Sequence, residues 1–501
     1  MPIVLFVSVF LIAACGLVYE LIAGTLASYL LGDSIFQFST VIGCYLFAMG
    51  IGSGMSRFIA RGLVARFVSI ELMVGLLGGF SSSIMFLAFA YTQAFRLALY
   101  SLVIGIGVLV GLEIPLLMRI LRDRFHFKDV VAHVLTFDYL GALGASLLFP
   151  IWLVPKMGLV RGALVFGIVN AAVALWSTYI FKDQIGPAGA TRAACAVVLV
   201  MLGAGMAGAD RISAAADNNL YADEVIFSRA TPYQRIVLTR WKDDVRLFLS
   251  GHLQFSSRDE YRYHEALVHP GLSAVPSARR VLVLGGGDGL AVRELLRYPG
   301  IETITLVDLD PEMTHLFSTH PYLKQLNGGS LLSPKVHVIN ADAFPWLEEH
   351  RDFYDFIVVD FPDPTNYSLG KLYTTAFYRL MGHHLARNGL AVIQSTSPLF
   401  ARQSYWCIAE TLRQAGLRAY PYHVYVPSFG EWGYMIASPS QYGPYEPPTT
   451  LPSGLRFLTV AGVPQLFDFP TDMRPVPAEA NRLNDQVLVR YYDREWSEIA
   501  R

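Results

Sequence analysis

A glycine loop followed by spaced acidic residues is the part of this sequence best suited to chemistry. The stretch VLVLGGGDGLAVRELL at 281–296 is typical of a strand that runs into a glycine turn and then a helix. Glycines there, including Gly285 and Gly287, let the backbone approach a bound group closely. Asp308 ends the next apolar run, about 20 residues further on, where it can accept hydrogen bonds from ribose hydroxyls. This order predicts an α/β domain that binds a nucleoside-bearing molecule.

A second set of carboxylates ends a later apolar run. Asp360 closes the predicted strand DFIVVD, and Asp363 follows within the stretch DFPDP. Open α/β sheets bind their ligands outside the carboxyl ends of the strands, which is where these acids are expected. Asp-Pro and Pro-Asp pairs also favour turns for purely local reasons. The two acids are therefore candidates for a ligand site, with a polar turn at the strand end as the alternative.

The elements that would position these acids lie in the C-terminal half. Strand and helix patterns alternate over residues 276–445, which predicts a Rossmann-like, methyltransferase-type doubly wound sheet with helices on both faces. Residues 217–275 alternate with a period of two, so a small antiparallel β domain is expected before it. The proline-rich residues 446–501 are expected to wrap the surface as a C-terminal extension.

Residues 1–210 differ in composition from the rest of the chain. The whole sequence has 501 residues, is 53% hydrophobic and has a formal net charge of −1, which gives no reason to expect a nucleic-acid partner. Windows of about 20 apolar residues can cross a bilayer. Such windows lie at about 2–31, 36–57, 67–92, 96–118, 131–154, 159–181 and 191–209. They predict an N-terminal α-helical membrane bundle of about seven helices, with the lipid bilayer as its partner.

Acidic residues inside these windows suggest a further role for the bundle. Glu20 and Glu113 lie within two of the windows, and Asp138 lies within or near another. Intramembrane carboxylates often mark ion or proton pathways. One hypothesis is that they bind a cationic amine or protons at the interface of an inverted repeat; the alternative is that they hold helices together. The cysteines have neither metal-ligand nor disulfide spacing, so no metal site is expected.

Seven short segments resemble, in order and spacing, the signature segments of the polyamine aminopropyltransferases, the spermidine synthase family. They are YQRIVL, LSGHLQF, RDEYRYHEALVHP, GGGDG, VDLD, NADAF and DFPDP, within about residues 225–440. With its apolar N-terminal region, the chain resembles the membrane-fused branch. The resemblance implies transfer of an aminopropyl group from decarboxylated S-adenosylmethionine, a co-substrate and not a prosthetic group, to an amine such as putrescine. Methylthioadenosine would be released.

The resemblance also implies roles for the acids. Asp360 would be the general base and Asp363 would bind the amine. Asp288 would contact the aminopropyl nitrogen of the donor, because a carboxylate attracts that bare ammonium and would repel the carboxylate of intact S-adenosylmethionine. Asp308 would hold the ribose hydroxyls, and Asp342 would accept from the adenine amino group. The ordinary alternatives are a helix N-cap for Asp288 and an Asx turn for Asp342.

Other positions match family segments around the two substrates. Gln254 matches a position near the donor, whereas Gln234, Tyr263 and His264 match positions near the amine. Trp432 would form an apolar wall of the amine channel. In the alternative, these residues have only structural roles: the glutamines lie at the surface, Tyr263 and His264 pack a helix, and Trp432 lies at the edge of the core.

The sequence departs from the family on the acceptor side. Ser250 stands where the family usually has an acid, Phe361 and Pro362 replace two serines, and 365–367 replaces a glycine-containing part of the substrate-covering loop. The family's tyrosine near the tryptophan turn has no clear equivalent, although Phe429 is nearby. These differences leave the identity of the acceptor amine open, whereas the identity of the donor is not affected.

The predicted function is a membrane-anchored aminopropyltransferase that makes spermidine from putrescine, or a similar polyamine from another diamine. Two alternatives stay open. One is a methyltransferase that uses intact S-adenosylmethionine, which Asp288 and the paired acids disfavour. The other is a non-catalytic membrane transporter or sensor that binds a nucleoside or a polyamine. Family members are commonly dimers or tetramers, so a homo-oligomer is also open.

The loop charges and the origin of the donor indicate different sides of the cell membrane for the C-terminal half. Basic residues cluster in the loops between the second and third and between the fourth and fifth windows, at Arg57, Arg61, Arg66, Arg119, Arg122, Arg124 and Lys128. Both loops are expected in the cytoplasm. If every window spans, the C-terminal half lies outside; if 191–209 does not span, it lies in the cytoplasm. Because the implied donor is a cytosolic metabolite, we favour the cytoplasmic side.

Overall fold

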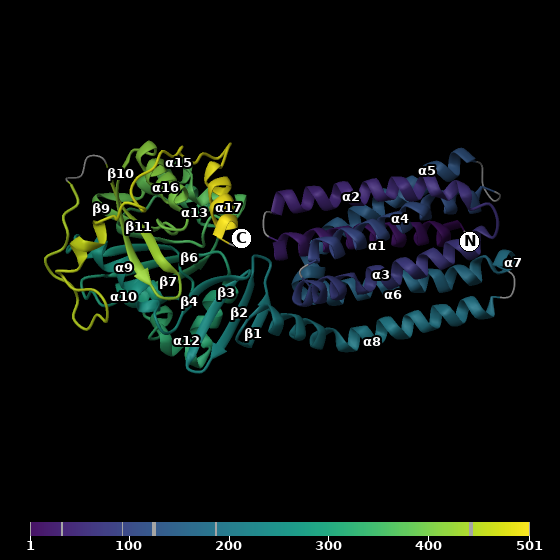
Figure 1. The fold of residues 1–501 in the computed structure, drawn as a ribbon, viewed down its shortest axis with the longest axis horizontal. Helices are drawn as coiled ribbons and strands as arrows, with labels where there is room; N and C mark the ends of the chain where they lie inside the picture. Colours follow the sequence, from purple (N-terminus) through teal and green to yellow (C-terminus); the bar gives the residue numbers. More distant parts are fainter. Residues whose placement is uncertain are drawn as a thin grey trace. The chain divides into compact units, whose positions relative to one another are not determined.

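The computed structural model describes residues 2–31, 34–92, 94–122, 127–185, 188–439 and 444–499, so that Arg124 lies outside the described residues. The chain forms two compact units, Met1–Val225 and Ile226–Arg501 (Figure 1). The first unit is helical and the second contains both β-sheets. The predicted order of a helical bundle followed by an α/β half is therefore confirmed.

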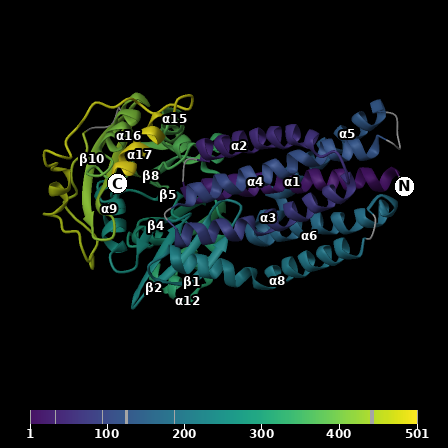
Figure 2. The same ribbon diagram turned by 45° about the vertical axis from the view of Figure 1, so that its right-hand side comes forward.

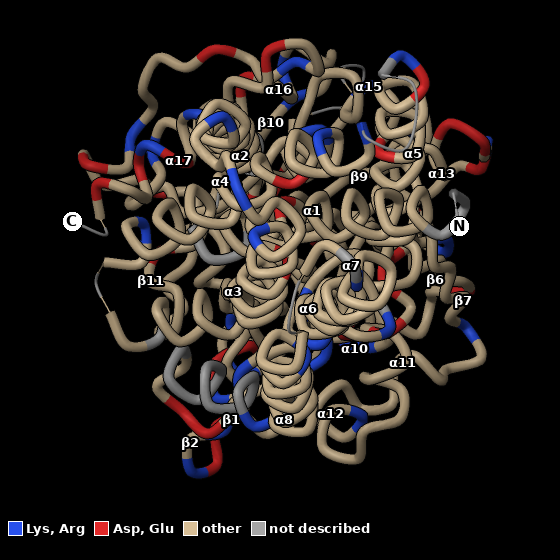
Figure 3. Tube along the Cα trace, turned by 90° about the vertical axis from the view of Figure 1, so that its right-hand side faces the viewer, with Lys and Arg blue, Asp and Glu red and all other residues tan. Residues whose placement is uncertain are grey.

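Long helices that run side by side make up most of unit 1 (Figures 1 and 2). They are α1 (Pro2–Leu31), α2 (Ser34–Met55), α3 (Leu63–Tyr91), α4 (Phe95–Leu121), α5 (Phe127–Leu148), α6 (Val154–Ile180) and α8 (Gly189–Leu220). The short helical segments η1 (Ser56–Phe58), η2 (Phe149–Leu153) and α7 (Lys182–Ile185) lie between them along the chain. Among the described residues, 7 helices are long and apolar enough to cross a membrane, as the windows predict. Figure 3 looks along these helices and draws their coils mostly tan, because acidic and basic residues are sparse in them.

Glycines allow close helix packing in unit 1. A Cβ atom on Gly111 of α4 would lie 2.2 Å from the carbonyl oxygen of Met49 in α2, so only glycine lets these backbones touch. At the end of α4, Arg119 donates a hydrogen bond of 3.0 Å to the carbonyl oxygen of Ser56 in η1. The two basic loops therefore lie at the same end of the bundle.

Polar residues lie in the interior of unit 1. Glu113 is buried, whereas Glu20 and Asp138 are only half-buried. Glu71, which we did not predict, is fully buried and accepts a hydrogen bond of 3.1 Å from Asn170 Nδ2. This contact links α3 to α6, as expected of polar residues that hold helices together.

Unit 2 begins with a small four-stranded sheet. Its strands are β1 (Glu224–Ala230), β2 (Arg235–Trp241), β3 (Asp244–Leu249) and β4 (His252–Ser256), in that order, and β2, β3 and β4 pair antiparallel. Ser250 and Gly251 form the turn between β3 and β4, with φ of 49° and 87°. Two successive left-handed residues are typical of a tight hairpin turn, so Ser250, where the family usually has an acid, serves the turn.

A seven-stranded sheet forms the main part of unit 2, in the order β10-β11-β9-β8-β5-β6-β7. Its strands are β5 (Arg280–Gly285), β6 (Thr303–Asp308), β7 (Val336–Asn340), β8 (Tyr354–Asp360), β9 (Leu385–Gln394), β10 (Leu417–Val426) and β11 (Gly430–Pro439). Strands β9, β8, β5, β6 and β7 are parallel, while β11 and β10 are antiparallel to their neighbours. The chain leaves β5 toward β6 and returns on the other side at β8, which makes their carboxyl ends a topological switch point where ligands bind.

Helices cover both faces of this sheet. They are α9 (Glu260–Leu272), α10 (Leu290–Leu295), α11 (Pro311–Thr319), α12 (Pro321–Leu326), α13 (Ala343–Glu349), α14 (Tyr367–Gly370), α15 (Thr375–His383), α16 (Arg402–Gln414) and α17 (Val487–Ile499). Alternate residues of one strand enter different cores: Val281 and Val283 of β5 face one, and Leu282 and Leu284 face the other. Residues 281–284 of β5 are all apolar for that reason, and the doubly wound prediction is confirmed.

The C-terminal extension does more than wrap the surface. After an irregular stretch that contains the turn η5 (Val463–Phe467), it ends in α17. Glu495 of α17 accepts hydrogen bonds from the backbone nitrogens of Gln403 and Ser404, at 2.6 and 3.0 Å. These are among the free N–H groups at the start of α16, so α17 supplies a cap for that helix. We had expected only surface wrapping here.

Candidate functional site

The site lies where the glycine loop passes over the end of β8. Gly285, the last residue of β5, is the parallel partner of Asp360 in β8. Its φ is 81°, and a Cβ atom there would lie 2.3 Å from the carbonyl oxygen of Asp360. Gly286 donates its backbone N–H to the same oxygen at 3.2 Å. Only glycine fits this turn, and it brings the loop and Asp360 together as the sequence predicts.

Asp308 at the end of β6 lies on the other side of the loop. Its carboxylate accepts backbone hydrogen bonds from Gly287, at 3.0 Å, and from Asp310, at 2.9 Å. A Cβ atom on Gly287 would lie 2.7 Å from this carboxylate. Desolvation raises the pKa of Asp308 to about 6, although the two N–H groups oppose the shift. The carboxylate is thus fixed beside the loop, with lone pairs left to accept hydroxyl groups.

Asp288 lies within the loop itself. Its Oδ1 accepts the backbone N–H of Leu290, the first residue of α10, at 2.9 Å. The N-cap position of this helix is Gly289, so Asp288 is not the N-cap that we gave as an alternative. Desolvation raises the pKa of Asp288, while the charges of His264 and Arg293 oppose the shift. A carboxylate so placed is available to a cationic group.

Two of the residues expected near the donor have other partners. Asp342 begins α13 by accepting the backbone N–H of Phe344 at 3.1 Å, and its Oδ2 forms an ion pair of 2.6 Å with Lys371. The Asx turn that we gave as the alternative is therefore present. Gln254 donates to the carbonyl oxygen of His252, on its own strand, at 3.1 Å. This hydrogen bond directs it along β4 and does not connect it to the acids of the site.

Gln234 lies beside Asp310, next to Asp308, and its predicted place near the amine stays a prediction. Its Nε2 donates to Asp310 Oδ2 at 3.0 Å, and Thr231 Oγ1 donates to the same oxygen at 2.8 Å. Because Asp310 donates its backbone N–H to Asp308, Gln234 supports the turn that holds Asp308.

Asp360 lies between Tyr263 and the glycine loop. Tyr263 Oη donates to its Oδ1 at 2.6 Å, and a Cβ atom on Gly286 would lie 3.3 Å from its Oδ2. Desolvation and the charge of Asp288 raise the pKa of Asp360 to about 6, against the opposing effects of His264 and Tyr263. One oxygen is therefore held by a tyrosine while the other faces the glycine loop.

A buried ionic network supports Asp360 from α9. His264 Nδ1 lies 3.0 Å from Glu260 Oε2, and Arg293 of α10 makes two contacts of 2.9 Å with Glu260. Burial alone would lower the pKa of His264, but the hydrogen bond and charge of Glu260 outweigh it and raise the pKa. We did not predict Glu260 or Arg293; their only signal is that they are charged positions in helices otherwise buried.

Asp363 is surrounded by three neutral donors. Gln394 Nε2 donates to its Oδ1 at 2.9 Å, whereas Thr396 Oγ1 and Tyr492 Oη each donate to Oδ2 at 3.0 Å. Desolvation raises the pKa of Asp363, and these three hydrogen bonds oppose the shift. Thr396 has a φ of 54°, a strained conformation for a β-branched residue.

None of these three donors was predicted. The polar run QSTS directly after the apolar run GLAVI marks a third strand end, and would have pointed to Gln394 and Thr396. Tyr492 has no such signal in the sequence.

Aromatic side chains line the region next to Tyr263. The ring of Phe429 lies 6.2 Å from that of Tyr263 and 4.9 Å from that of Trp432, between centroids, and the ring of Tyr434 lies 5.5 Å from that of Tyr263. Trp432 is buried, and its Nε1 has no hydrogen-bond partner in the part of the chain that the structure describes. Phe429 thus lies between Tyr263 and Trp432, and as a phenylalanine it has no hydroxyl group to offer there.

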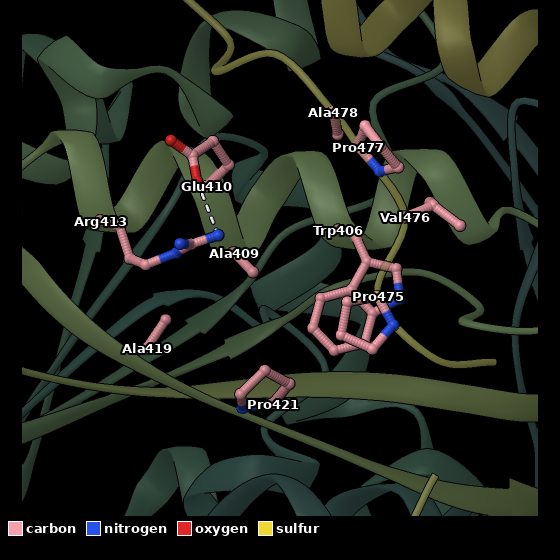
Figure 4. A pocket seen from close by; sticks show the side chains of 10 residues that line it. All are labelled: Trp406, Ala409, Glu410, Arg413, Ala419, Pro421, Pro475, Val476, Pro477 and Ala478. Atoms are coloured by element: carbon pink, nitrogen blue, oxygen red, sulfur yellow. Dashed lines mark ion pairs between the residues drawn. The ribbon is translucent and has the colours of Figure 1, made fainter. Parts of the chain in front are cut away.

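A cavity of about 490 Å³ lies elsewhere in unit 2. Figure 4 shows Trp406, Glu410 and Arg413 of α16 on one side of it and the segment 475–478 on another, with an ion pair of 2.6 Å between Glu410 and Arg413. None of the acids described above lines it. Its size therefore does not make it the functional site.

This sheet order, glycine loop and set of acids define a Rossmann-like α/β enzyme with a site for a nucleoside-bearing substrate. Residues 260–446 match the family model described as the spermine/spermidine synthase domain. The chain is 53% identical over 495 residues to a polyamine aminopropyltransferase of Leptospira interrogans, covering 99% of each chain. It is 55% identical over 504 residues to polyamine aminopropyltransferase 2 of Ralstonia nicotianae, again covering 99% of each. The chain belongs to the polyamine aminopropyltransferase family.

Solved structures of spermidine synthases are more distant. One, in complex with the transition-state analogue AdoDATO, is 24% identical with a TM-score of 0.45, over 49% of this chain and 86% of that chain. Another, from Thermotoga maritima, is 24% identical with a TM-score of 0.44, over 49% of this chain and 85% of that chain.

Proposed function

We propose that this protein transfers the aminopropyl group of decarboxylated S-adenosylmethionine to a diamine, with putrescine as the first candidate, and releases methylthioadenosine. Its family supports this class of reaction. The observation that carries the proposal is the state of Asp360, whose Oδ1 is held by Tyr263 while its Oδ2 faces the glycine loop. A base at the junction of two substrates must be held in this way.

The donor would lie along the carboxyl ends of β5 and β6. The Asp308 carboxylate would accept the ribose hydroxyls, with Gly285 and Gly287 allowing the backbone to approach. Asp288 would pair with the aminopropyl ammonium group. Asp342 would accept from the adenine amino group, for which its Oδ2 would have to share or leave its contact with Lys371.

The acceptor would lie between Asp363 and Asp360. One ammonium group of the diamine would bind Asp363, and the other nitrogen, once deprotonated, would attack the aminopropyl carbon attached to sulfur. The C–N bond forms as the C–S bond breaks, and the electron pair of that bond goes to sulfur, which leaves as neutral methylthioadenosine. Asp360 accepts the proton from the attacking nitrogen. Its pKa of about 6 leaves it ionised and able to do so at neutral pH.

The charge of the site favours cationic substrates. Asp288, Asp308, Asp360 and Asp363 meet there. The charge of His264 opposes both Asp288 and Asp360, and that of Arg293 opposes Asp288. A sulfonium donor without a carboxylate and a diamine would both be attracted by this excess of negative charge. Intact S-adenosylmethionine would bring its carboxylate against Asp288, which argues against a methyltransferase.

The test uses the purified full-length protein in detergent with decarboxylated S-adenosylmethionine and a panel of amines, and follows methylthioadenosine by mass spectrometry. We expect amine-dependent release that Asp360→Asn lowers by about 10²–10⁴-fold. Asp352→Asn is the matched control, because Asp352 is half-exposed and pairs with Arg280. Donor binding without release for any amine would contradict the proposal, and methyl transfer from intact S-adenosylmethionine would indicate a methyltransferase.

We further propose that unit 1 anchors the protein in the cell membrane and that unit 2 faces the cytoplasm. The long apolar helices support insertion, and the cytosolic origin of the proposed donor supports the side. The basic loops at one end of the bundle would place unit 2 on the opposite side if all these helices cross. Protease treatment of sealed cells decides between the two: unit 2 should be protected, and its cleavage would place it outside.

A further inference from the structure

We propose that the C-terminal helix α17 belongs to the amine end of the site, where Tyr492 is a positioning residue that orients Asp363 toward the acceptor amine. The inference rests on the proposed function, because Asp363 is taken as the residue that binds the amine. The matched family domain ends at residue 446, so α17 lies outside it.

The hydrogen bonds on Asp363 leave room for one more partner. An ionised carboxylate offers about four acceptor positions. Gln394 takes one position on Oδ1, and Thr396 and Tyr492 take two on Oδ2. The remaining position is on Oδ1, so the three donors set both the plane of the carboxylate and the direction from which an ammonium group can bind.

Tyr492 is held in place by α17 and by the segment that leads into it. Asn481 donates to the carbonyl oxygens of Gly370 and Tyr373, each at 3.0 Å, and accepts the backbone N–H of Leu488 at 3.3 Å. A Cβ atom on Gly370 would lie 2.5 Å from Val489 Cγ2. The helix is therefore packed directly against the residues that follow 365–367, where the sequence departs from the family.

Tyr492 also affects the charge of Asp363. Its side chain is buried, and its hydroxyl is one of the donors that oppose the rise in the pKa of Asp363 caused by desolvation. The other titratable groups that act on Asp363 or share its surroundings are His252 of β4 and Tyr373 of η4 (Lys371–Tyr373). Removal of the Tyr492 hydroxyl should leave Asp363 protonated up to a higher pH, and a protonated carboxyl binds an ammonium group poorly.

The experiment compares Tyr492→Phe with wild type in the full-length enzyme. Loss of a hydrogen bond to a charged group should raise KM for the diamine by about tenfold or more, while KM for the donor and kcat change little. The fall of kcat/KM for the amine at low pH, its acid limb, should occur at a higher pH in the variant. Tyr491→Phe is the matched control, because Tyr491 is the preceding residue of α17 and its hydroxyl lies 3.4 Å from Glu479.

The outcomes separate this inference from the proposed function. An amine KM and an acid limb equal to those of wild type would overturn the role of Tyr492 alone. Equal losses for both substrates with a lower Tm and an unmoved acid limb would show a purely structural role, and would overturn it too. The position of the limb does not depend on the fraction of folded enzyme, so a less stable variant is still informative. If wild type releases no methylthioadenosine with any amine, the proposed function fails and the inference with it.

Discussion

Asp360 combines two requirements that oppose each other. As the proposed base, it must be partly desolvated to act on a buried substrate, yet it must stay ionised at neutral pH to accept a proton. Desolvation and the neighbouring charge of Asp288 raise its pKa, whereas His264 and the hydrogen bond from Tyr263 lower it, and the result is about 6. A base with a pKa just below the working pH satisfies both requirements.

The first prediction concerns the pH dependence of the reaction. Because only ionised Asp360 can accept a proton, kcat should fall as the pH drops through about 6. Tyr263→Phe removes a hydrogen bond that stabilises the ionised form of Asp360, so the pH at which kcat falls should be higher in this variant. Initial rates across a pH series, with saturating substrates, measure the shift.

Tyr378→Phe is the control for that shift. Tyr378 is buried, as Tyr263 is, but its hydroxyl has no hydrogen-bond partner among the described residues. The pH at which kcat falls should be the same in Tyr378→Phe as in wild type. If kcat of Tyr263→Phe falls at the same pH as that of wild type, the result would argue against Asp360 as the base.

At the scale of elements, the turn between β5 and α10 lies between Asp308, the proposed ribose ligand, and Asp360, the proposed base. The second prediction is that Gly287→Ala weakens donor binding, because the added Cβ atom would lie 2.7 Å from the Asp308 carboxylate and force it away. KM for the donor should rise while KM for the amine changes little. Gly300→Ala is the control, since its Cβ atom would lie 3.9 Å from its nearest neighbour. Equal donor KM values for the two variants would contradict the role of Asp308.

The third prediction concerns the ionic network between α9 and α10. Arg293→Leu leaves Glu260 and Glu294 buried without their shared partner, so the free energy of unfolding should fall by about 3–5 kcal/mol. Arg279→Ala breaks an exposed pair with Glu302 and should lower it by about 1 kcal/mol or less. Denaturant unfolding measures both values. Similar values for the two variants would show that the network does not stabilise the fold.

This network also predicts sensitivity to acid. Burial alone would raise the pKa of Glu294, but His269 and Arg293 outweigh it and hold the pKa at about 2. A pKa below the ordinary value means that the ionised carboxylate stabilises the folded protein. That contribution is complete above the ordinary carboxyl pKa and is lost as the pH falls toward 2.

The sequence predicts those parts of the site that a short stretch of chain determines. Gly287 and Asp308 are 21 residues apart, and the alternation of strand and helix between them is enough to bring them together. The hydrogen bond of Gln254 to His252 follows from the course of its own strand, which no motif encodes, and its place near the donor stays a prediction. Tyr492 and Asp363 are 129 residues apart, and their contact depends on how α17 packs, which no local pattern encodes.

At the scale of the whole molecule, the described groups of the site all come from one unit. Residues from Gln234 to Tyr492 lie within Ile226–Arg501. The fourth prediction is that a chain of residues 221–501, which keeps β1 whole, folds in solution and retains the KM values of the full-length enzyme. The mass-spectrometric assay for methylthioadenosine measures this, with Asp360→Asn of the same chain as the inactive control. A folded but inactive chain would show that the helical bundle contributes to catalysis.

The placement of Tyr492 bears on how such enzymes diverge. In the proposed function, the donor is held by residues at the glycine turn and at the ends of β5 and β6, where a change of residue disturbs the sheet itself. The proposed acceptor end includes Tyr492 of α17, a helix that is joined to the sheet by a long irregular segment. Such segments tolerate insertion and exchange. Lineages that need another polyamine can therefore alter their tail and keep the donor half unchanged.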